Sequence, residues 1–272
     1  MCARAVTGGG GVDLHVEETG NPRGRPVLFM HGFSQSRLSW ARQLHSGLAD
    51  DLRLVALDMR GHGLSGKPRD AYGDSALWAE DIANVIAALA LDRPILCGWS
   101  YGGYIIADYL RAYGQERLGG VHLVAAATKM GTPEAAGYLG RDFLALAPGF
   151  FATDVEESVR AMETFVRLCV RDPLPAADLY TTLGYNMVVS PHVRRALFSR
   201  VLDNDDVLRA LRLPVLITHG LEDRIVLPRA SEHYATLIPA AQTSFYPDVG
   251  HTPFWEDAPR FNRELAAFAQ SI

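Results

Sequence analysis

The chain has 272 residues, of which 48% are hydrophobic and 21% are charged, and its formal net charge is −5. This composition excludes a disordered chain, and the length fits one large domain with or without an insertion. No run of basic residues gives the electrostatic signature of a nucleic-acid binder, so no nucleic-acid partner is expected.

Cysteine spacing and hydropathy exclude further classes of protein. Cys2, Cys97 and Cys169 are widely spaced and include no C-x-x-C pair, so neither a disulfide framework nor a zinc cage is expected. No apolar run approaches the ~20 residues that cross a bilayer, and the first residues lack the apolar segment of a signal peptide. We therefore expect a cytoplasmic protein with no membrane partner.

The first hundred residues contain one alternating segment and three short apolar runs. Residues 12–19 alternate apolar and polar side chains, which predicts an antiparallel strand at the sheet edge. The runs are too short for helices and are almost entirely apolar, which predicts strands buried on both faces. They comprise residues 26–30, 52–57 and 94–97.

Helical segments alternate with these strands. Residues 75–91 place apolar side chains at i, i+3 and i+4, with Asp74 or Ser75 as the N-cap. The alternation predicts a mostly parallel sheet with helices on both faces. Further strands are expected at residues 121–127, 214–219 and 243–246, and further helices at residues 228–237 and 256–269.

The alternation stops between residues 128 and 204, where aromatic residues, methionines and prolines accompany short helical stretches. We interpret residues 128–204 as a helical cap (lid) over the strand ends. The cap is inserted into an α/β core formed by residues 1–127 and 205–272. Ordinary helices packed on the sheet edge are the alternative.

Residues 98–102 read GWSYG and match the pattern G-x-S-x-G. An apolar run precedes them and an amphipathic segment follows, so Ser100 is expected on a sharp strand-to-helix turn that exposes its hydroxyl. The helix N-terminus would direct backbone N–H groups toward an oxyanion formed there. Ser100 is the candidate nucleophile, and a tight turn with an incidental serine is the alternative.

A serine nucleophile needs a base, and the base needs an orienting acid, in the chain order serine, acid, histidine. Three histidines lie beyond the cap. His251 is the candidate base because it lies in a loop between the last strand and the last helix. His219, at a strand end, is expected to pack, and His233 is expected on the surface.

The acid is expected in the loop that follows the strand at residues 214–219. Asp223 is the preferred candidate there, ahead of Glu222 and Asp248. The loop after residues 121–127 offers no carboxylate, which favours Asp223 further.

These motifs resemble the α/β-hydrolase family, and the resemblance covers nearly the whole chain except the cap. It implies an eight-stranded, mostly parallel sheet with a lid inserted after strand six, and a triad of Ser100, His251 and Asp223. It also implies an oxyanion hole formed by the backbone N–H groups of Phe33 and Tyr101. The motifs are His31-Gly32-Phe33, Asp58-x-Arg60-Gly61-x-Gly63-x-Ser65, Gly98 to Gly102, Gly220-x-x-Asp223 and Gly250-His251.

Within this family the chain is most similar to the cofactor-free esterases, perhydrolases and non-haem haloperoxidases. Ser100 argues against epoxide hydrolases and haloalkane dehalogenases, which use an aspartate at that position. The proline that perhydrolases carry soon after the His-Gly dipeptide is missing, because Ser34 and Gln35 stand there. No metal-ligand or phosphate-loop spacing occurs, so we expect no metal and no cofactor.

We therefore expect a serine hydrolase that cleaves a small, largely apolar ester or lactone through an acyl-enzyme on Ser100. The aromatic and methionine content of the cap indicates an apolar pocket, with Trp99, Phe143 and Met187 as candidate substrate contacts. The expected partner is a small-molecule substrate, and a homo-oligomer is compatible with an apolar cap.

Three other functions remain open from the sequence. A perhydrolase or a C–C bond hydrolase would use the same triad, and a ligand receptor would keep the fold without catalysis. In a C–C bond hydrolase, Arg194 or Arg195 would bind a substrate carboxylate, although a solvated surface position is the simpler interpretation of both residues.

Overall fold

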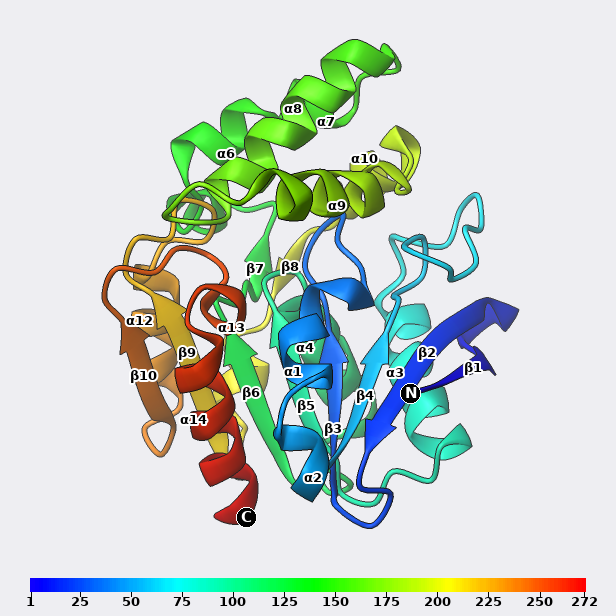
Figure 1. The fold of residues 1–272 in the computed structure, drawn as a ribbon, viewed down its shortest axis with the longest axis vertical. Helices are drawn as coiled ribbons and strands as arrows, with labels where there is room; N and C mark the ends of the chain where they lie inside the picture. Colours follow the sequence, from blue (N-terminus) through cyan, green and yellow to red (C-terminus); the bar gives the residue numbers. More distant parts are fainter.

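A computed structural model describes all 272 residues. Eight strands form one sheet in the order β1-β2-β4-β3-β5-β6-β9-β10 (Figure 1). The pairs β1–β2 and β2–β4 are antiparallel, and every other neighbouring pair is parallel. The predicted eight-stranded, mostly parallel sheet is confirmed. Its strands are β1 (Cys2–Thr7), β2 (Asp13–Gly20), β3 (Arg25–Met30), β4 (Leu52–Leu57), β5 (Ile95–Trp99), β6 (Gly120–Val124), β9 (Val215–Gly220) and β10 (Gln242–Tyr246).

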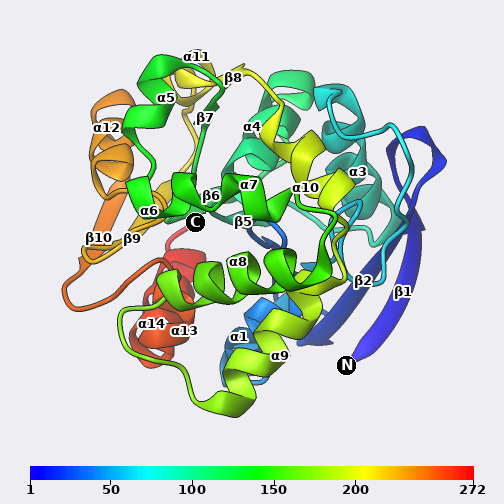
Figure 2. The ribbon, with the colours of Figure 1, turned by 90° about the horizontal axis from the view of Figure 1, so that it is seen from above.

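Helices cover both faces of the sheet, with α3, α4 and α12 on one side and α1, α13 and α14 on the other (Figure 2). None of the helices combines the length and apolar character that crossing a bilayer requires. The helices and 3-10 turns of the core are η1 (Gly9–Gly11), η2 (Arg37–Trp40), α1 (Ala41–Leu44), α2 (Leu48–Asp51), α3 (Ser75–Ala88), α4 (Gly102–Tyr113), α11 (Asp205–Arg209), α12 (Arg229–Leu237), α13 (Pro253–Glu256) and α14 (Ala258–Gln270).

Strand alternation divides the buried side chains between two cores. In β3, Val27 and Phe29 belong to the core under α1 and α14, whereas Leu28 and Met30 belong to the core under α3 and α4. Successive side chains of a strand point to opposite faces, so an all-apolar strand requires cover on both. The apolar runs predicted this two-sided burial correctly.

Element ends differ from the predicted ones where the backbone changes direction. The strand expected at 121–127 ends at Val124, because Ala125 takes a positive φ of 40°. The helix expected at 256–269 begins at Ala258, because Asp257 has non-helical backbone angles and its side chain accepts from Arg260 N–H. Asp74, one of the two expected N-caps, is the N-cap of α3, and that helix ends at Ala88 rather than at residue 91.

The chain between β6 and β9 crosses above the carboxyl ends of the strands (Figures 1 and 2). It begins and ends with a two-stranded antiparallel ribbon, which the sequence did not predict because each strand has only two residues. The division into a core and a cap that acts as a separate unit stays a prediction. The elements of this segment are β7 (Lys129–Met130), α5 (Pro133–Gly137), α6 (Arg141–Ala145), α7 (Ala147–Phe150), α8 (Val155–Leu168), α9 (Ala176–Met187), α10 (Pro191–Phe198) and β8 (Leu202–Asp203).

Candidate active site

Ser100 occupies the sharp turn between β5 and α4. Its φ of 54° lies in the left-handed region, which is strained for a residue with a side chain. Its N–H donates to the Val124 carbonyl at 3.0 Å, and its own carbonyl accepts from the N–H groups of Gly103 and Ala127 at 2.9 and 3.0 Å. Backbone hydrogen bonds to two neighbouring segments therefore hold the strained turn.

The glycines around Ser100 allow a close approach of backbone segments. A Cβ on Gly98 would lie 2.7 Å from the Gly102 carbonyl oxygen, and a Cβ on Gly102 would lie 2.8 Å from that of Met30. Real Cβ atoms do not occupy such positions, so the G-x-S-x-G pattern is required by packing here.

Two backbone N–H groups next to Ser100 have no hydrogen-bond partner, those of Phe33 and Tyr101. Phe33 lies in a turn closed by a 3.2 Å hydrogen bond from Gln35 N–H to the Gly32 carbonyl, and Tyr101 directly precedes α4. Both residues line the same cavity as Ser100. Unpaired N–H groups are rare in folded proteins, and a pair at such a position is the donor set that an oxyanion requires.

His251 lies in the loop between β10 and α13, and hydrogen bonds hold this loop from two sides. Its N–H donates at 2.9 Å to the carbonyl of Cys169, which lies in residues 128–204, the cap segment. Its carbonyl accepts from the indole Nε1 of Trp99, also at 2.9 Å, which ties the loop to the residue before Ser100. Glu256 accepts from Gly250 N–H at 3.0 Å and closes the loop onto α13.

Asp223 is buried and accepts the Nδ1 hydrogen of His251 on Oδ2, at 2.6 Å. Its Oδ1 accepts from the N–H groups of Ile225 and Val226 at 2.7 and 3.1 Å. Burial alone would raise the pKa of Asp223, but the imidazoles of His251 and His219 lower that pKa to about 2. The ionised carboxylate therefore keeps the His251 proton on Nδ1.

His219 is buried at the end of β9, as expected, but it also contacts the candidate acid. Its Nε2 lies 3.0 Å from Asp223 Oδ2 and 2.8 Å from the Val226 carbonyl oxygen. Both partners are acceptors, so Nε2 carries the proton, and Nδ1 accepts from the Ser231 hydroxyl at 2.6 Å. The sequence analysis expected His219 only to pack and did not predict that it hydrogen-bonds the candidate acid. The position of His219 at a strand end, four residues before Asp223, could have indicated this contact.

The Nε2 atom of His251 is buried and makes no hydrogen bond in the structure. Because Nδ1 carries the proton, Nε2 holds the lone pair of the ring. No hydrogen bond joins it to the Ser100 hydroxyl in the structure, and its lone pair is available to a proton donor. The serine–histidine hydrogen bond of unliganded enzymes is often long and tightens only when substrate binds.

A cavity of about 330 Å³ adjoins Ser100, and no charged residue lines it. Phe143 of α6 forms part of its wall, together with Ala135, Leu139 and Phe198. Such a lining favours an apolar group of a bound molecule.

A second, narrower cavity includes Trp99 in its lining. Polar side chains are also present there, namely Gln35, Ser39, Thr182, Tyr185 and Thr252. Met187 lines neither cavity, because α9 turns it toward the cap interior, where its Sδ lies 3.6 Å from Arg194 Nη2. The expected substrate contact of Met187 stays a prediction, and the structure places this residue outside both cavities.

A family model described as the α/β hydrolase fold matches residues 25–258. The chain belongs to the α/β-hydrolase family. The crystal structure of the esterase RhEst1 from Rhodococcus sp. ECU1013 is 39% identical, with a TM-score of 0.95 over 100% of this chain and 99% of that chain. A non-heme haloperoxidase of Rhodococcus erythropolis is 28% identical over 98% of this chain and 99% of its own. A bifunctional esterase/perhydrolase of Acinetobacter calcoaceticus is 27% identical over the same shares.

These similarities confirm two expectations from the sequence. This α/β-hydrolase is an enzyme of the hydrolase class, similar to the esterase, perhydrolase and non-haem haloperoxidase group. A hydrolase of this fold acts on a small-molecule substrate.

The His31 side chain is hydrogen-bonded to two loops of the α/β-hydrolase core. Its Nε2 accepts from Met59 N–H at 3.1 Å, and its Nδ1 donates to the Gly32 carbonyl at 2.9 Å. Burial lowers the pKa of His31 to about 4, so the ring is neutral at physiological pH. This arrangement agrees with the interpretation that His31 shapes the loop carrying Phe33.

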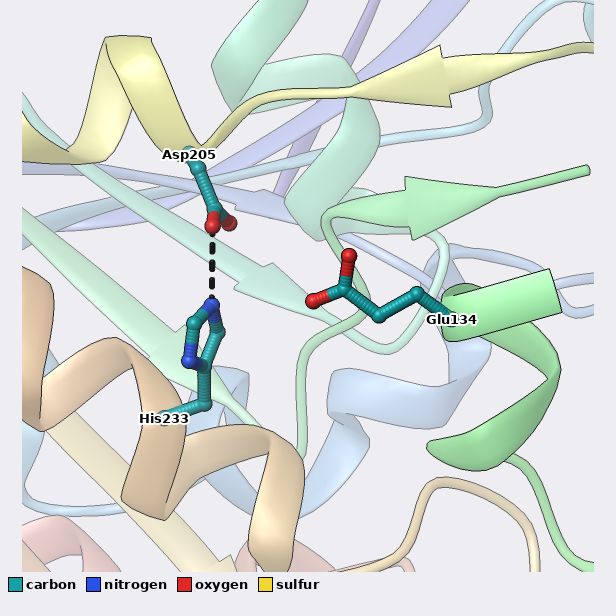
Figure 3. A group of neighbouring side chains, drawn as sticks. All are labelled: Glu134, Asp205 and His233. Atoms are coloured by element: carbon teal, nitrogen blue, oxygen red, sulfur yellow. Dashed lines mark hydrogen bonds and ion pairs between the residues drawn. The ribbon is translucent and has the colours of Figure 1, made fainter. Parts of the chain in front are cut away.

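Glu134, Asp205 and His233 form a polar cluster at the junction of cap segment and core, with ligand atoms within 4.8 Å of one another (Figure 3). The Lys129 ammonium donates to Glu134 Oε1 and lies 2.9 Å from Asp205 Oδ2, so a cation of the chain itself already bridges both carboxylates. Burial alone would lower the pKa of Lys129, but these carboxylates raise it. His233 is half-buried and bonds to Asp205 at 2.9 Å, so its expected surface position is only partly correct.

Arg194 differs most from its expected position. Its side chain on α10 is completely buried, whereas a solvated surface position was the simpler interpretation. It lines neither cavity, and Arg195 is an exposed residue that bonds the Phe151 carbonyl. The apolar cavity beside Ser100 therefore contains no arginine for a substrate carboxylate.

Proposed function

We propose that this α/β-hydrolase cleaves small esters or lactones of largely apolar carboxylic acids through an acyl-enzyme on Ser100. The observation that carries the proposal is the uncharged cavity of about 330 Å³ that Ser100 lines together with Phe33 and Tyr101, whose backbone N–H groups are unpaired. A nucleophile, an oxyanion site and an apolar acyl pocket thus share one space.

The hydrogen bond between His251 Nδ1 and Asp223 Oδ2 supports the following mechanism. His251 Nε2 takes the hydroxyl proton as Ser100 Oγ attacks the carbonyl carbon, and it then returns that proton to the leaving alcohol. Asp223 holds the imidazole in the required tautomer and stabilises the imidazolium. Water activated by the same Nε2 then attacks the acyl-enzyme, and the carboxylic acid is released.

The N–H groups of Phe33 and Tyr101 would bind the oxyanion of each tetrahedral intermediate. A donor of this kind typically contributes about 3 to 4 kcal/mol to transition-state stabilisation. The donors are backbone groups fixed by the turn around Phe33 and by the start of α4, so little reorganisation is needed during the reaction.

The two cavities differ in what they can hold. The acyl chain would occupy the apolar cavity at Phe143, because burying each CH₂ there is favourable by about 0.8 kcal/mol. The narrower cavity at Trp99 has a volume of about 30 Å³, which holds water but no alcohol, and its hydroxyl and amide side chains supply hydrogen-bond partners for that water.

C–C bond hydrolysis has less support than ester hydrolysis, because neither Arg194 nor Arg195 reaches the cavity to bind a carboxylate. Perhydrolysis would use the same residues with hydrogen peroxide in place of water. Both remain outcomes of the experiment below.

The experiment is a burst-phase assay with p-nitrophenyl acetate, butyrate and octanoate. We expect a stoichiometric burst from the wild type and a fall in kcat of about 10⁴-fold or more in Ser100→Ala. Ser199→Ala, a serine of the cap segment outside both cavities, is the matched control and should retain the burst.

Two results would contradict the proposal. Retention of the burst in Ser100→Ala would exclude Ser100 as the nucleophile. Absence of serine-dependent turnover on all three esters, with the wild type folded, would favour a C–C bond substrate instead.

A further inference from the structure

Arg194 is a completely buried cation with no carboxylate partner. Its guanidinium donates only to neutral acceptors: Ser34 Oγ at 3.2 Å, Ser158 Oγ at 2.9 Å, the Phe150 carbonyl at 3.4 Å, the Asn186 carbonyl at 3.2 Å and Met187 Sδ at 3.6 Å. Burying a charge without a counter-ion is unfavourable even when its N–H groups are hydrogen-bonded. Burial also lowers the pKa of Arg194 to about 10, which still leaves it charged at neutral pH.

The contact with Ser34 leads directly to the candidate oxyanion hole. Ser34 follows Phe33 in the turn that is closed by the hydrogen bond from Gln35 N–H to the Gly32 carbonyl. Ser34 has a φ of 59° at the third position of this turn, where glycine or asparagine is usually needed. A strained serine there persists only if its surroundings hold it.

Two hydrogen bonds of the Ser34 hydroxyl stabilise this strained turn. The hydroxyl accepts from Arg194 Nε and donates to the Asn186 carbonyl, which also accepts from Arg194 Nη2 at 3.2 Å. Ser34, Arg194 and Asn186 therefore form a closed three-membered hydrogen-bond ring between the turn and helices α9 and α10.

We infer that Arg194 is a positioning residue for the oxyanion hole, which it acts on through Ser34. It fixes the turn so that Phe33 N–H is directed at the substrate oxygen, and its uncompensated positive charge beside this turn favours the negative charge that forms there. The inference rests on the proposed function, because it requires a reaction with an oxyanion.

The same contacts make the oxyanion hole dependent on the cap segment. From α10, Arg194 bonds α7, α8 and α9 through Phe150, Ser158 and Asn186, whereas Ser34 is its only hydrogen-bonded partner in the core. A displacement of these helices from the core would break the ring and release the strained turn.

The test compares Arg194→Gln, Ser34→Ala and the double variant. We expect each single variant to lower kcat on p-nitrophenyl butyrate by about 10- to 100-fold with KM changed less than about threefold, because a misdirected oxyanion donor affects the transition state only. The double variant should lose no more than the worse single variant, because both substitutions break one unit.

Ser158→Ala is the matched control, since it removes a 2.9 Å hydrogen bond from the same guanidinium on the side away from the turn. It should lower the melting temperature as Arg194→Gln does, but leave kcat within about twofold. Binding of an alkyl boronic acid, whose adduct with Ser100 carries the oxyanion, should weaken in Arg194→Gln by the same factor as kcat.

An unchanged kcat in folded Arg194→Gln would overturn the inference, as would an equal loss in Ser158→Ala or additive losses in the double variant. If Arg194→Gln does not fold, Ser34→Ala decides, because it interrupts the same ring and leaves the guanidinium in place. Failure of the proposed function is distinguishable, because the wild type would then lack the Ser100-dependent burst.

Discussion

His251 Nδ1 and Asp223 Oδ2 lie 2.6 Å apart, although 28 residues separate them in the chain. The distance depends on backbone packing at the two loops. A Cβ on Gly220 would lie 2.0 Å from the Gly250 carbonyl oxygen, so only glycine at position 220 lets the acid loop and the histidine loop meet. The hydrogen bond therefore has a direct cause in the sequence.

Replacing Asp223 by asparagine should lower kcat on p-nitrophenyl butyrate by about 10³- to 10⁴-fold. The amide can donate to Nδ1 and stabilise the wrong tautomer, with the proton on Nε2 where the base must accept. Steady-state kinetics and circular dichroism of the same preparation measure the effect.

The control for this prediction is His219→Gln. It removes one donor to Asp223 Oδ2 and keeps the carboxylate, so we expect a loss of no more than about 10-fold. Equal losses in the two variants would mean that Asp223 has no separate role.

Changes at the apolar cavity should alter the preference for acyl chain length. Phe143→Ala enlarges the cavity and should raise the octanoate-to-acetate ratio of kcat/KM by about 10-fold, whereas Ala135→Leu should lower it similarly. Phe151→Ala makes the same truncation outside the cavity and should leave the ratio unchanged. If all three variants keep the wild-type ratio, the acyl group binds elsewhere.

Buried neutral histidines should make the protein lose stability below about pH 6.5. Burial lowers the pKa of His31 to about 4 and that of His122 to about 3, whereas in the unfolded chain both lie near about 6.5. The unfolded state therefore binds more protons as the pH falls, and each histidine costs about 1.4 kcal/mol per pH unit between about 6.5 and its folded pKa.

Urea unfolding at pH 7.5, 6.5, 5.5 and 4.5 measures this dependence. Asp223 does not contribute in this range, because the stabilisation that its depressed pKa provides is lost only below the unfolded value of about pH 3.9. His122→Gln should reduce the slope of unfolding free energy against pH by about one proton. A stability independent of pH from 7.5 to 4.5 would contradict the neutral burial of both rings.

Removing the Lys129 ammonium should destabilise the junction of cap segment and core. Lys129→Met leaves the largely buried Asp205 without its nearest cation, which should cost about 1 to 3 kcal/mol of unfolding free energy. Arg209→Gln removes a mostly exposed partner of the same carboxylate and should cost less than about 1 kcal/mol. Urea unfolding distinguishes the two variants, and equal effects would mean that burial of Lys129 is not decisive.

The sequence alone determined the features that depend on local patterns. Apolar runs of four to six residues located the buried strands, because runs of this length are too short for helices. The spacing of Gly98, Ser100 and Gly102 located the strained turn, because only glycines fit beside it. The order of serine, acid and histidine along the chain selected the three residues that we propose as the triad.

Only the tertiary structure decided the features that depend on contacts between distant segments. The bond from His219 to Asp223, the bridge from Lys129 to Asp205 and the ring of Arg194, Ser34 and Asn186 join polar side chains whose partners no local pattern reveals. From the sequence alone, an arginine in an amphipathic segment is predicted to be exposed, because the helices that pack around it are not known. The energy of such a buried charge depends on which acceptors the fold brings to it, and that is set by packing rather than by spacing.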